Sequence, residues 1–168
     1  MTMRRLLVAP LVLGLLAVLV ACSNPFAPTA TPSEQAAALA PEVKSTVEGY
    51  LTKLNERDAT AAGEFYADDA SFLWVEDGRI VYETRTAAIA GLANFFAGFG
   101  GSRLEAYDLK ISMLSEGAAV ATFKFTQTIA AAGPASLKAD GAMTLALTQN
   151  DGSWKILAVH KSASGFAR

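Results

Sequence analysis

Four long β-compatible segments in the C-terminal half restrict the fold of this chain more than any other feature. They run from Leu104 to Leu114, Ala118 to Ile129, Leu137 to Gln149 and Trp154 to Ser162. Turn-forming strings separate them, namely Ser-Glu-Gly, Ala-Ala-Gly-Pro and Asn-Asp-Gly-Ser. Successive strands joined by short turns predict an antiparallel meander.

The residues before this meander favour helices. Pro41 suits the first turn of a helix. The apolar residues that follow fall on one helical face, and the helix is expected to end near Asn55: Val43, Val47, Tyr50, Leu51 and Leu54.

A second, shorter helix and a hairpin are expected next. Asp58 is a suitable N-cap for a helix that continues to Tyr66, and residues 71–75 and 79–83 read as two strands joined by Glu76-Asp77-Gly78. Thr86 is expected to cap a third helix, whose apolar residues are Ile89, Leu92, Phe95 and Phe96. The predicted class is α+β, with three helices on one side of a strongly curved antiparallel sheet.

The N-terminus reads as an export signal. Arg4 and Arg5 precede an apolar run that extends from Leu6 to Val20 and stops at Ala21-Cys22. Leu19-Val20-Ala21-Cys22 resembles a lipobox, so residues 1–21 are predicted to be a lipoprotein signal peptide and Cys22 the lipidated residue. Attachment to the bilayer would then rest on two or more acyl chains. The alternative is an ordinary secretory signal with an incidental cysteine.

The remaining chain divides into a tether and one domain. Residues 22–40 are rich in Pro, Thr and Ala and are predicted to be a flexible linker, and residues 41–164 have the size of a single domain. Cys22 is the sole cysteine, so its lipidation leaves no thiol for a disulfide, a metal or a nucleophile. Loss of Arg4 and Arg5 leaves 12 basic against 16 acidic residues, a net charge of about −4, which argues against nucleic-acid binding.

The order of these elements and several local strings resemble the nuclear transport factor 2-like superfamily, in particular its SnoaL-like members and the association domain of calcium/calmodulin-dependent kinase. The resemblance implies a cone-shaped, strongly bent sheet wrapped around three helices, with a pocket at the open end. It also implies a possible homodimer through the outer sheet face. The strings that carry it are Gly49-Tyr50-Leu51, Asn55-Glu56-Arg57-Asp58, Phe65-Tyr66-Ala67-Asp68-Asp69-Ala70 and Asp151-Gly152-Ser153-Trp154-Lys155-Ile156 continuing to His160-Lys161-Ser162.

Comparison with ketosteroid isomerase, an enzyme of this superfamily, tests one activity. The isomerase's oxyanion-hole tyrosine corresponds to Tyr50, but its carboxylate base corresponds to Trp74, and an indole cannot accept a proton from carbon. Its second acid would fall near residues 143–145, where no carboxyl group is present. Steroid isomerisation is therefore not expected, and a core tyrosine with a satisfied hydroxyl is the preferred explanation of Tyr50.

The kinase association domain implies a different site. Two arginines of its pocket correspond to Lys124 and Lys161, which would favour a small carboxylate if both lysines faced inward. The alternative is that the lysines face solvent. Strand alternation supports it, because Phe123 and Phe125 lie on the face opposite Lys124 and would fill the core.

The other titratable residues fit structural roles. His160 is the only histidine, so we expect no metal site of the multi-histidine kind. No cofactor is expected either. His160 is expected either to make a structural hydrogen bond or to line the pocket. Glu64, Asp68 and Asp69 are explained by turns and an exposed helix.

The expected function is that of a cell-envelope lipoprotein, facing the periplasm from the outer membrane if the cell is Gram-negative. Its SnoaL-like domain would bind a small apolar or weakly anionic ligand, or serve as an assembly module; no catalytic residue is assigned. The residues predicted to line its pocket are Tyr50, Trp74, Lys124, His160 and Lys161. The alternative is a small-molecule isomerase or hydrolase of the SnoaL or ketosteroid isomerase type, with Glu83 or Asp108 as base.

Overall fold

The computed structural model describes residues 31–130 and 136–165, and this part of the chain contains four helices and six strands. The helices are α1 (Pro32–Ala38), α2 (Ala40–Glu56), α3 (Ala59–Gly63) and α4 (Arg85–Gly98). The strands are β1 (Leu73–Glu76), β2 (Arg79–Tyr82), β3 (Gly101–Ser115), β4 (Ala118–Ala130), β5 (Ser136–Asn150) and β6 (Ser153–Ala163). The predicted signal, Cys22 and the Ala-Ala-Gly-Pro turn lie outside the described residues.

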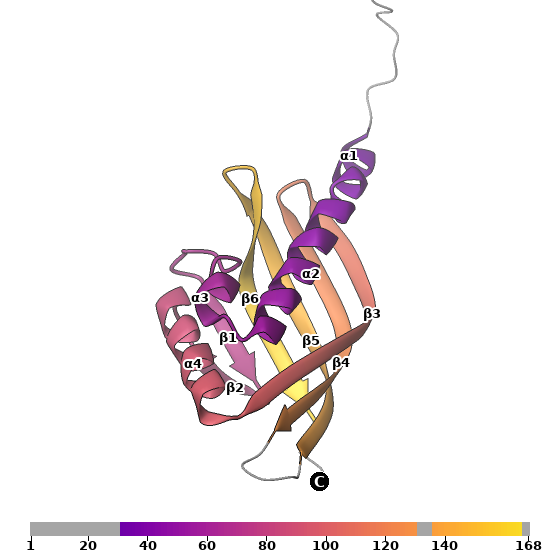
Figure 1. The fold of residues 1–168 in the computed structure, drawn as a ribbon. Helices are drawn as coiled ribbons and strands as arrows, with labels where there is room; N and C mark the ends of the chain where they lie inside the picture. Colours follow the sequence, from indigo (N-terminus) through magenta and orange to yellow (C-terminus); the bar gives the residue numbers. More distant parts are fainter. Residues whose placement is uncertain (1–30, 131–135, 166–168) are drawn as a thin grey trace, which may run out of the picture.

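The six strands form one curved sheet in the order β2-β1-β6-β5-β4-β3, with the helices on its concave side (Figure 1). The predicted α+β class and curved sheet are confirmed. The sheet is mixed rather than wholly antiparallel, because β1 runs parallel to β6 and joins the hairpin β1–β2 to the end of the meander. This parallel pairing places Glu76 opposite Lys161.

Two hairpin turns show why particular residues reverse the chain. Asp77 and Gly78 join β1 to β2 with φ values of 48° and 78°, and Asp151 and Gly152 join β5 to β6 with φ values of 48° and 73°. Positive φ at both central residues is typical of the two-residue hairpin turn that matches strand twist, and Asp-Gly is favoured there. The structure confirms both of these predicted reversals.

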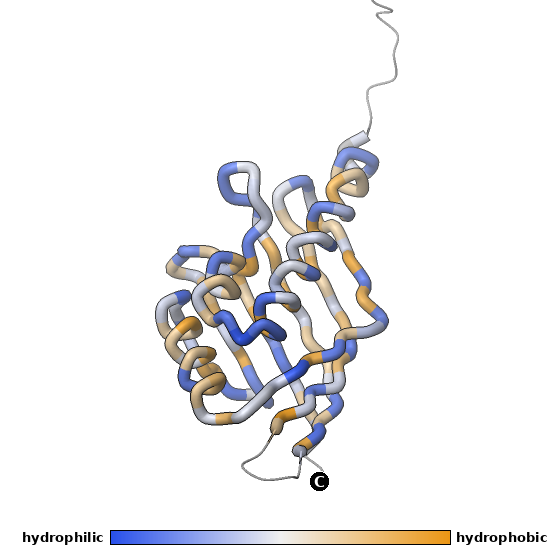
Figure 2. Tube along the Cα trace, viewed as in Figure 1, coloured by the Kyte–Doolittle hydropathy of each residue, from blue (hydrophilic) through white to orange (hydrophobic). Residues whose placement is uncertain are grey.

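Helix α2 crosses the concave face of the sheet and buries the apolar face predicted for it. Its buried residues are Val43, Val47, Tyr50 and Leu54. They pack on inward residues of the central strands, including Leu145, Leu147 and Ile156. Hydrophilic residues gather at the end of α2 and at the β5–β6 turn (Figure 2).

The end of α2 is tied to the elements that surround the site. Arg57, the C-cap residue at φ 62°, donates hydrogen bonds to the carbonyl oxygens of Phe96, Phe99 and Gly100. Asn55 exchanges two hydrogen bonds with the backbone of Leu104, at 2.9 and 2.7 Å. These contacts fix α4 and the start of β3 relative to α2.

Helix α1 is a difference from the sequence-based expectation, because it lies within the range predicted as linker. A capping box explains it: Thr31 Oγ1 accepts from the Glu34 backbone N–H, and Glu34 Oε2 accepts from the Thr31 N–H at 2.8 Å. A second difference is that α4 is capped by Thr84 rather than Thr86. None of the described helices has the length and apolar composition needed to span a bilayer.

Candidate functional site

A cavity of about 120 Å³ lies between the β1–β2 hairpin, α4 and the concave face of the sheet. Aromatic and aliphatic side chains form most of its walls: Trp74, Tyr82, Leu92, Phe95, Phe96 and Met143. Five polar side chains also line it: Asn55, Glu76, Ser102, Gln127 and Lys161. An apolar chamber with a few polar groups is the usual form of a small-molecule site.

An ion pair lies on the sheet side of this cavity. Glu76 Oε1 and Lys161 Nζ are 2.6 Å apart, and their side chains are 33% and 14% exposed. The Lys161 ammonium also lies 5.8 Å from the ring centroid of Phe125. A half-buried ammonium is costly unless it is paired, so Glu76 both holds Lys161 in place and cancels its charge at the cavity.

Gln127 is the one polar, non-aromatic residue buried in the described interior, at 6% exposure. It belongs to the inward row of β4, between Phe125 and Ile129. Its Nε2 donates to Ser102 Oγ over 3.4 Å, while its Oε1 has no hydrogen-bond partner among the described residues.

Trp74 lines the cavity and takes part in a series of aromatic contacts. Its ring meets Tyr82 edge to face at 5.8 Å and Tyr66 at 6.1 Å between centroids. The Tyr82 ring in turn packs on Gly91 of α4, where a Cβ would overlap the tyrosine hydroxyl and Cζ. Gly91 therefore allows Tyr82 to close the side of the cavity next to α4.

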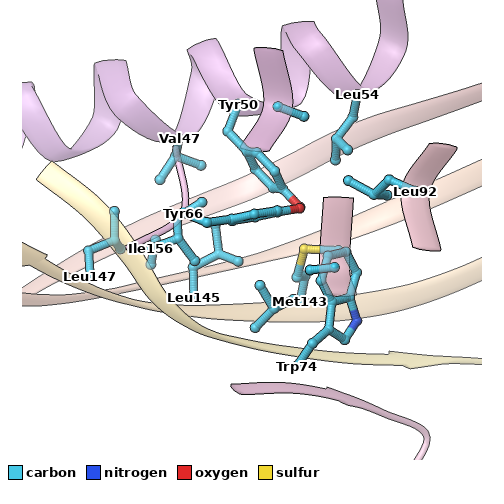
Figure 3. Close-up of a cluster of buried hydrophobic side chains, with 14 of the residues drawn as sticks. Val47, Tyr50, Leu54, Tyr66, Trp74, Leu92, Met143, Leu145, Leu147 and Ile156 are labelled. Carbon is cyan, nitrogen blue, oxygen red and sulfur yellow. The ribbon is translucent and has the colours of Figure 1, made fainter. Parts of the chain in front are cut away.

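Tyr50 and Tyr66 form a buried pair in the core and do not line the cavity. Their hydroxyl oxygens are 3.0 Å apart, and the two hydroxyls meet in Figure 3. Burial raises the pKa of both hydroxyls well above the usual range, and for Tyr66 the neighbouring Tyr50 raises the pKa further. Both tyrosines are therefore neutral at physiological pH.

The structure brings together some of the residues predicted for the pocket. Trp74 and Lys161 both line the cavity, as adjacent strands β1 and β6 present them on the concave face. Tyr50 packs edge to face on Tyr66 and is fully buried in the core. Its hydroxyl is directed at Tyr66 rather than at the cavity.

The other two predicted residues lie on the convex face of the sheet. Lys124 is exposed and pairs with Asp108 at 3.0 Å, because strand alternation directs Phe123 and Phe125 into the core. This agrees with the second of the two interpretations considered for Lys124. His160 is exposed because it follows the inward residue Val159 on β6.

Sequence reasoning missed Glu76 and Gln127. The signal for Glu76 was its spacing of two from Trp74, which places both on one face of a strand, but a turn had been assigned to it. The signal for Gln127 was its spacing of two from Phe125. The carboxylates considered as catalytic bases, Glu83 and Asp108, are both exposed and neither lines the cavity.

Known structures share this architecture at low sequence identity. A candidate scytalone dehydratase from Novosphingobium aromaticivorans superposes with a TM-score of 0.72 at 12% identity, covering 80% of this chain and 90% of that one. Hexachlorocyclohexane dehydrochlorinase LinA-type3 from Novosphingobium barchaimii gives 0.68 at 15%, covering 79% and 91%. A candidate calcium/calmodulin-dependent kinase II association domain from Xanthomonas campestris gives 0.63 at 17%, covering 74% and 86%. The fold is thus that of the nuclear transport factor 2-like class.

The sequence defines the family within that class. The model of the SnoaL-like domain matches residues 43–165, which is most of the chain. This chain belongs to the SnoaL-like domain family. No curated protein sequence matches it significantly.

Proposed function

We propose that this chain is a lipid-anchored envelope protein whose SnoaL-like domain binds a small, neutral, mainly apolar molecule. The observation that carries the proposal is the aromatic cavity between α4 and the β1–β2 hairpin. Its volume of about 120 Å³ is close to that of an engineered apolar cavity of roughly 150 Å³ that holds benzene. A ligand of one ring therefore matches its size.

The charges around the cavity favour a neutral ligand over an anion. Lys161 is already paired with Glu76, and Lys124 lies on the other face of the sheet with Asp108. An anion would have to displace Glu76 from Lys161 and leave a carboxylate in a half-buried place. Of the two ligand types expected from the sequence, apolar and weakly anionic, that cost opposes the weakly anionic one.

Calorimetric titration with toluene tests the binding proposal. The purified protein should bind toluene with one-to-one stoichiometry, and sodium benzoate should bind at least about tenfold more weakly because of the charge cost. Leu92→Phe, which fills part of the cavity, should weaken toluene binding while circular dichroism shows a folded domain. His160→Ala on the convex face is the matched control and should bind as wild type does. Absence of toluene binding to the wild-type protein would overturn the proposal.

A second candidate function is catalysis of an elimination reaction, and the position of Glu76 favours it. In such a reaction Glu76 would accept a proton from a substrate carbon, and the C–H electrons would form a carbon–carbon double bond. A hydroxyl leaving group would depart with its bonding electrons and take a proton from the Lys161 ammonium, so that it leaves as water, and the proton on Glu76 would then return to Lys161. Two structural neighbours are described as a dehydratase and a dehydrochlorinase. Formation of an enone from 4-hydroxybutan-2-one, abolished by Glu76→Gln while toluene still binds, would support this candidate; no turnover would exclude this dehydration.

The membrane anchor is proposed on the sequence of residues 1–22, independently of the cavity. A lipobox that ends at the sole cysteine supports it. The protein from cells should fractionate with membranes and carry acyl chains on a mature N-terminus at Cys22. Cys22→Ser should abolish acylation, whereas detection of intact Met1 and no acyl group on the wild-type protein would refute the anchor.

A further inference from the structure

Gln127 is a polar residue in an inward row of β4 whose other members are apolar. It follows Phe123 and Phe125 in the inward row of β4 and precedes Ile129. A buried amide without its full set of hydrogen bonds costs about 1–3 kcal/mol, and native proteins leave few such groups unpaired. Because Gln127 lines the cavity, a ligand bound there could supply the hydrogen-bond donor that Gln127 Oε1 lacks.

Asn55, Glu76 and Lys161, which also line the cavity, have partners within the protein, whereas Trp74 Nε1 has none among the described residues. Asn55 uses both its oxygen and its nitrogen on the backbone of Leu104. Glu76 and Lys161 bind each other. Unpaired buried atoms elsewhere in the described residues, such as Trp154 Nε1, belong to residues that do not line this cavity.

The amide of Gln127 is also loosely held. Its one hydrogen bond, from Nε2 to Ser102 Oγ, is 3.4 Å long, which is beyond the usual range for such a bond. The terminal torsion of a glutamine has a broad minimum, so the amide can turn its oxygen toward the cavity at little cost. Trp74, whose Nε1 is unpaired as well, also lines the cavity.

We propose that Gln127 is the residue that determines ligand specificity, by accepting a hydrogen bond from a hydroxyl group on the ligand. The inference rests on the proposed binding function and narrows it to one chemical class, a single-ring compound with a hydroxyl group, of the size of phenol. The aromatic walls hold the ring, and the hydroxyl donates to Gln127 Oε1.

Competitive calorimetry with phenol, toluene and anisole tests this inference on the purified protein. Phenol and toluene have nearly the same size, and anisole retains the oxygen but cannot donate a hydrogen bond. Phenol should bind about tenfold more tightly than either, the difference expected for one buried hydrogen bond. Equal binding of phenol and toluene would overturn the specificity role and leave the binding function standing, whereas no binding of any of the three would overturn the binding function itself.

A matched pair of variants assigns the preference to Gln127. Gln127→Met keeps the shape and removes the amide, so it should abolish the preference for phenol without weakening toluene. Gln149→Met makes the same change on β5 away from the cavity and should keep the preference. A preference that persists in a folded Gln127→Met protein would contradict the inference. If that variant does not fold, the comparison of phenol with anisole on the wild-type protein still decides.

Discussion

Glu76 and Lys161 are 85 positions apart in the sequence, yet their charged atoms lie 2.6 Å apart at the cavity. The parallel pairing of β1 with β6 sets them directly opposite each other. The β1–β2 hairpin is thereby attached to the edge of the meander, and α4, which follows the hairpin, is carried over the concave face. One strand pairing thus assembles both the polar and the aromatic sides of the cavity.

This ion pair should show strong coupling in stability measurements. Lys161→Met leaves the Glu76 carboxylate half-buried without its partner, and Glu76→Gln leaves the ammonium likewise, so each should lower the free energy of unfolding by about 2 kcal/mol. The double variant should lose less than the sum of the two. Urea unfolding of all four proteins measures the coupling, and additive losses would show that the pair contributes nothing as a pair.

The tyrosine pair gives a second test of the buried structure. Tyr50→Phe removes one hydroxyl and leaves that of Tyr66 buried without a partner, which should cost about 1–3 kcal/mol. Tyr66→Phe should cost a similar amount. The double variant, in which no unpaired hydroxyl remains, should be more stable than the sum of the single losses predicts. Thermal and urea unfolding measure these losses. If the two hydroxyls acted independently, the loss in the double variant would equal the sum of the single losses, which would contradict the prediction.

The same pair predicts a loss of stability at alkaline pH. The pKa of each hydroxyl is raised in the folded state above its ordinary value of 10.0, so folding disfavours loss of the proton. The stabilising contribution is therefore complete below about pH 10 and falls as the pH rises above that value. The unfolding free energy should be level from about pH 8 to 10 and decline above about pH 10, and the Tyr50→Phe/Tyr66→Phe protein should decline less steeply. Equal slopes for the two proteins would contradict this account.

Local sequence patterns were sufficient for most of the secondary structure. The spacing of Val43, Val47 and Tyr50 predicted the buried face of α2, and Asp58 caps α3 as expected. The Asp-Gly pairs predicted two hairpin turns correctly. These features depend on residues within one helical turn or one reversal, which is why the sequence alone is informative about them.

The site depends on contacts that no local pattern encodes. Strand alternation on β4 was sufficient to suggest that Lys124 points outward. Which of His160 and Lys161 faces the cavity depends on how β6 pairs with β1 and β5. Glu76 was assigned to a turn, although it is the last residue of β1 and faces the cavity. The alanines of α1 carry little periodic signal, so the capping box of Thr31 and Glu34 is the local feature that indicates this helix.

Gly91 and Gly98 on α4 provide a matched pair of substitutions. A Cβ at position 91 would overlap the Tyr82 ring, whereas a Cβ at position 98 has no atom within 4 Å. Gly91→Ala should therefore displace Tyr82 from the cavity wall and weaken toluene binding by about tenfold or more, the equivalent of about 1.4 kcal/mol. Gly98→Ala should leave binding unchanged. Calorimetry on both variants checks this, and equal binding would show that Tyr82 is not part of the site.

The most direct test of the central claim is a titration of the ¹⁵N-labelled protein with toluene, followed by the indole N–H signals in NMR spectra. Trp74 lines the cavity, and Trp154 is buried away from it. The account predicts a saturable shift of the Trp74 signal while the Trp154 signal stays in place. A Trp74 signal that does not move at saturating toluene would contradict the claim that this cavity binds a small apolar molecule.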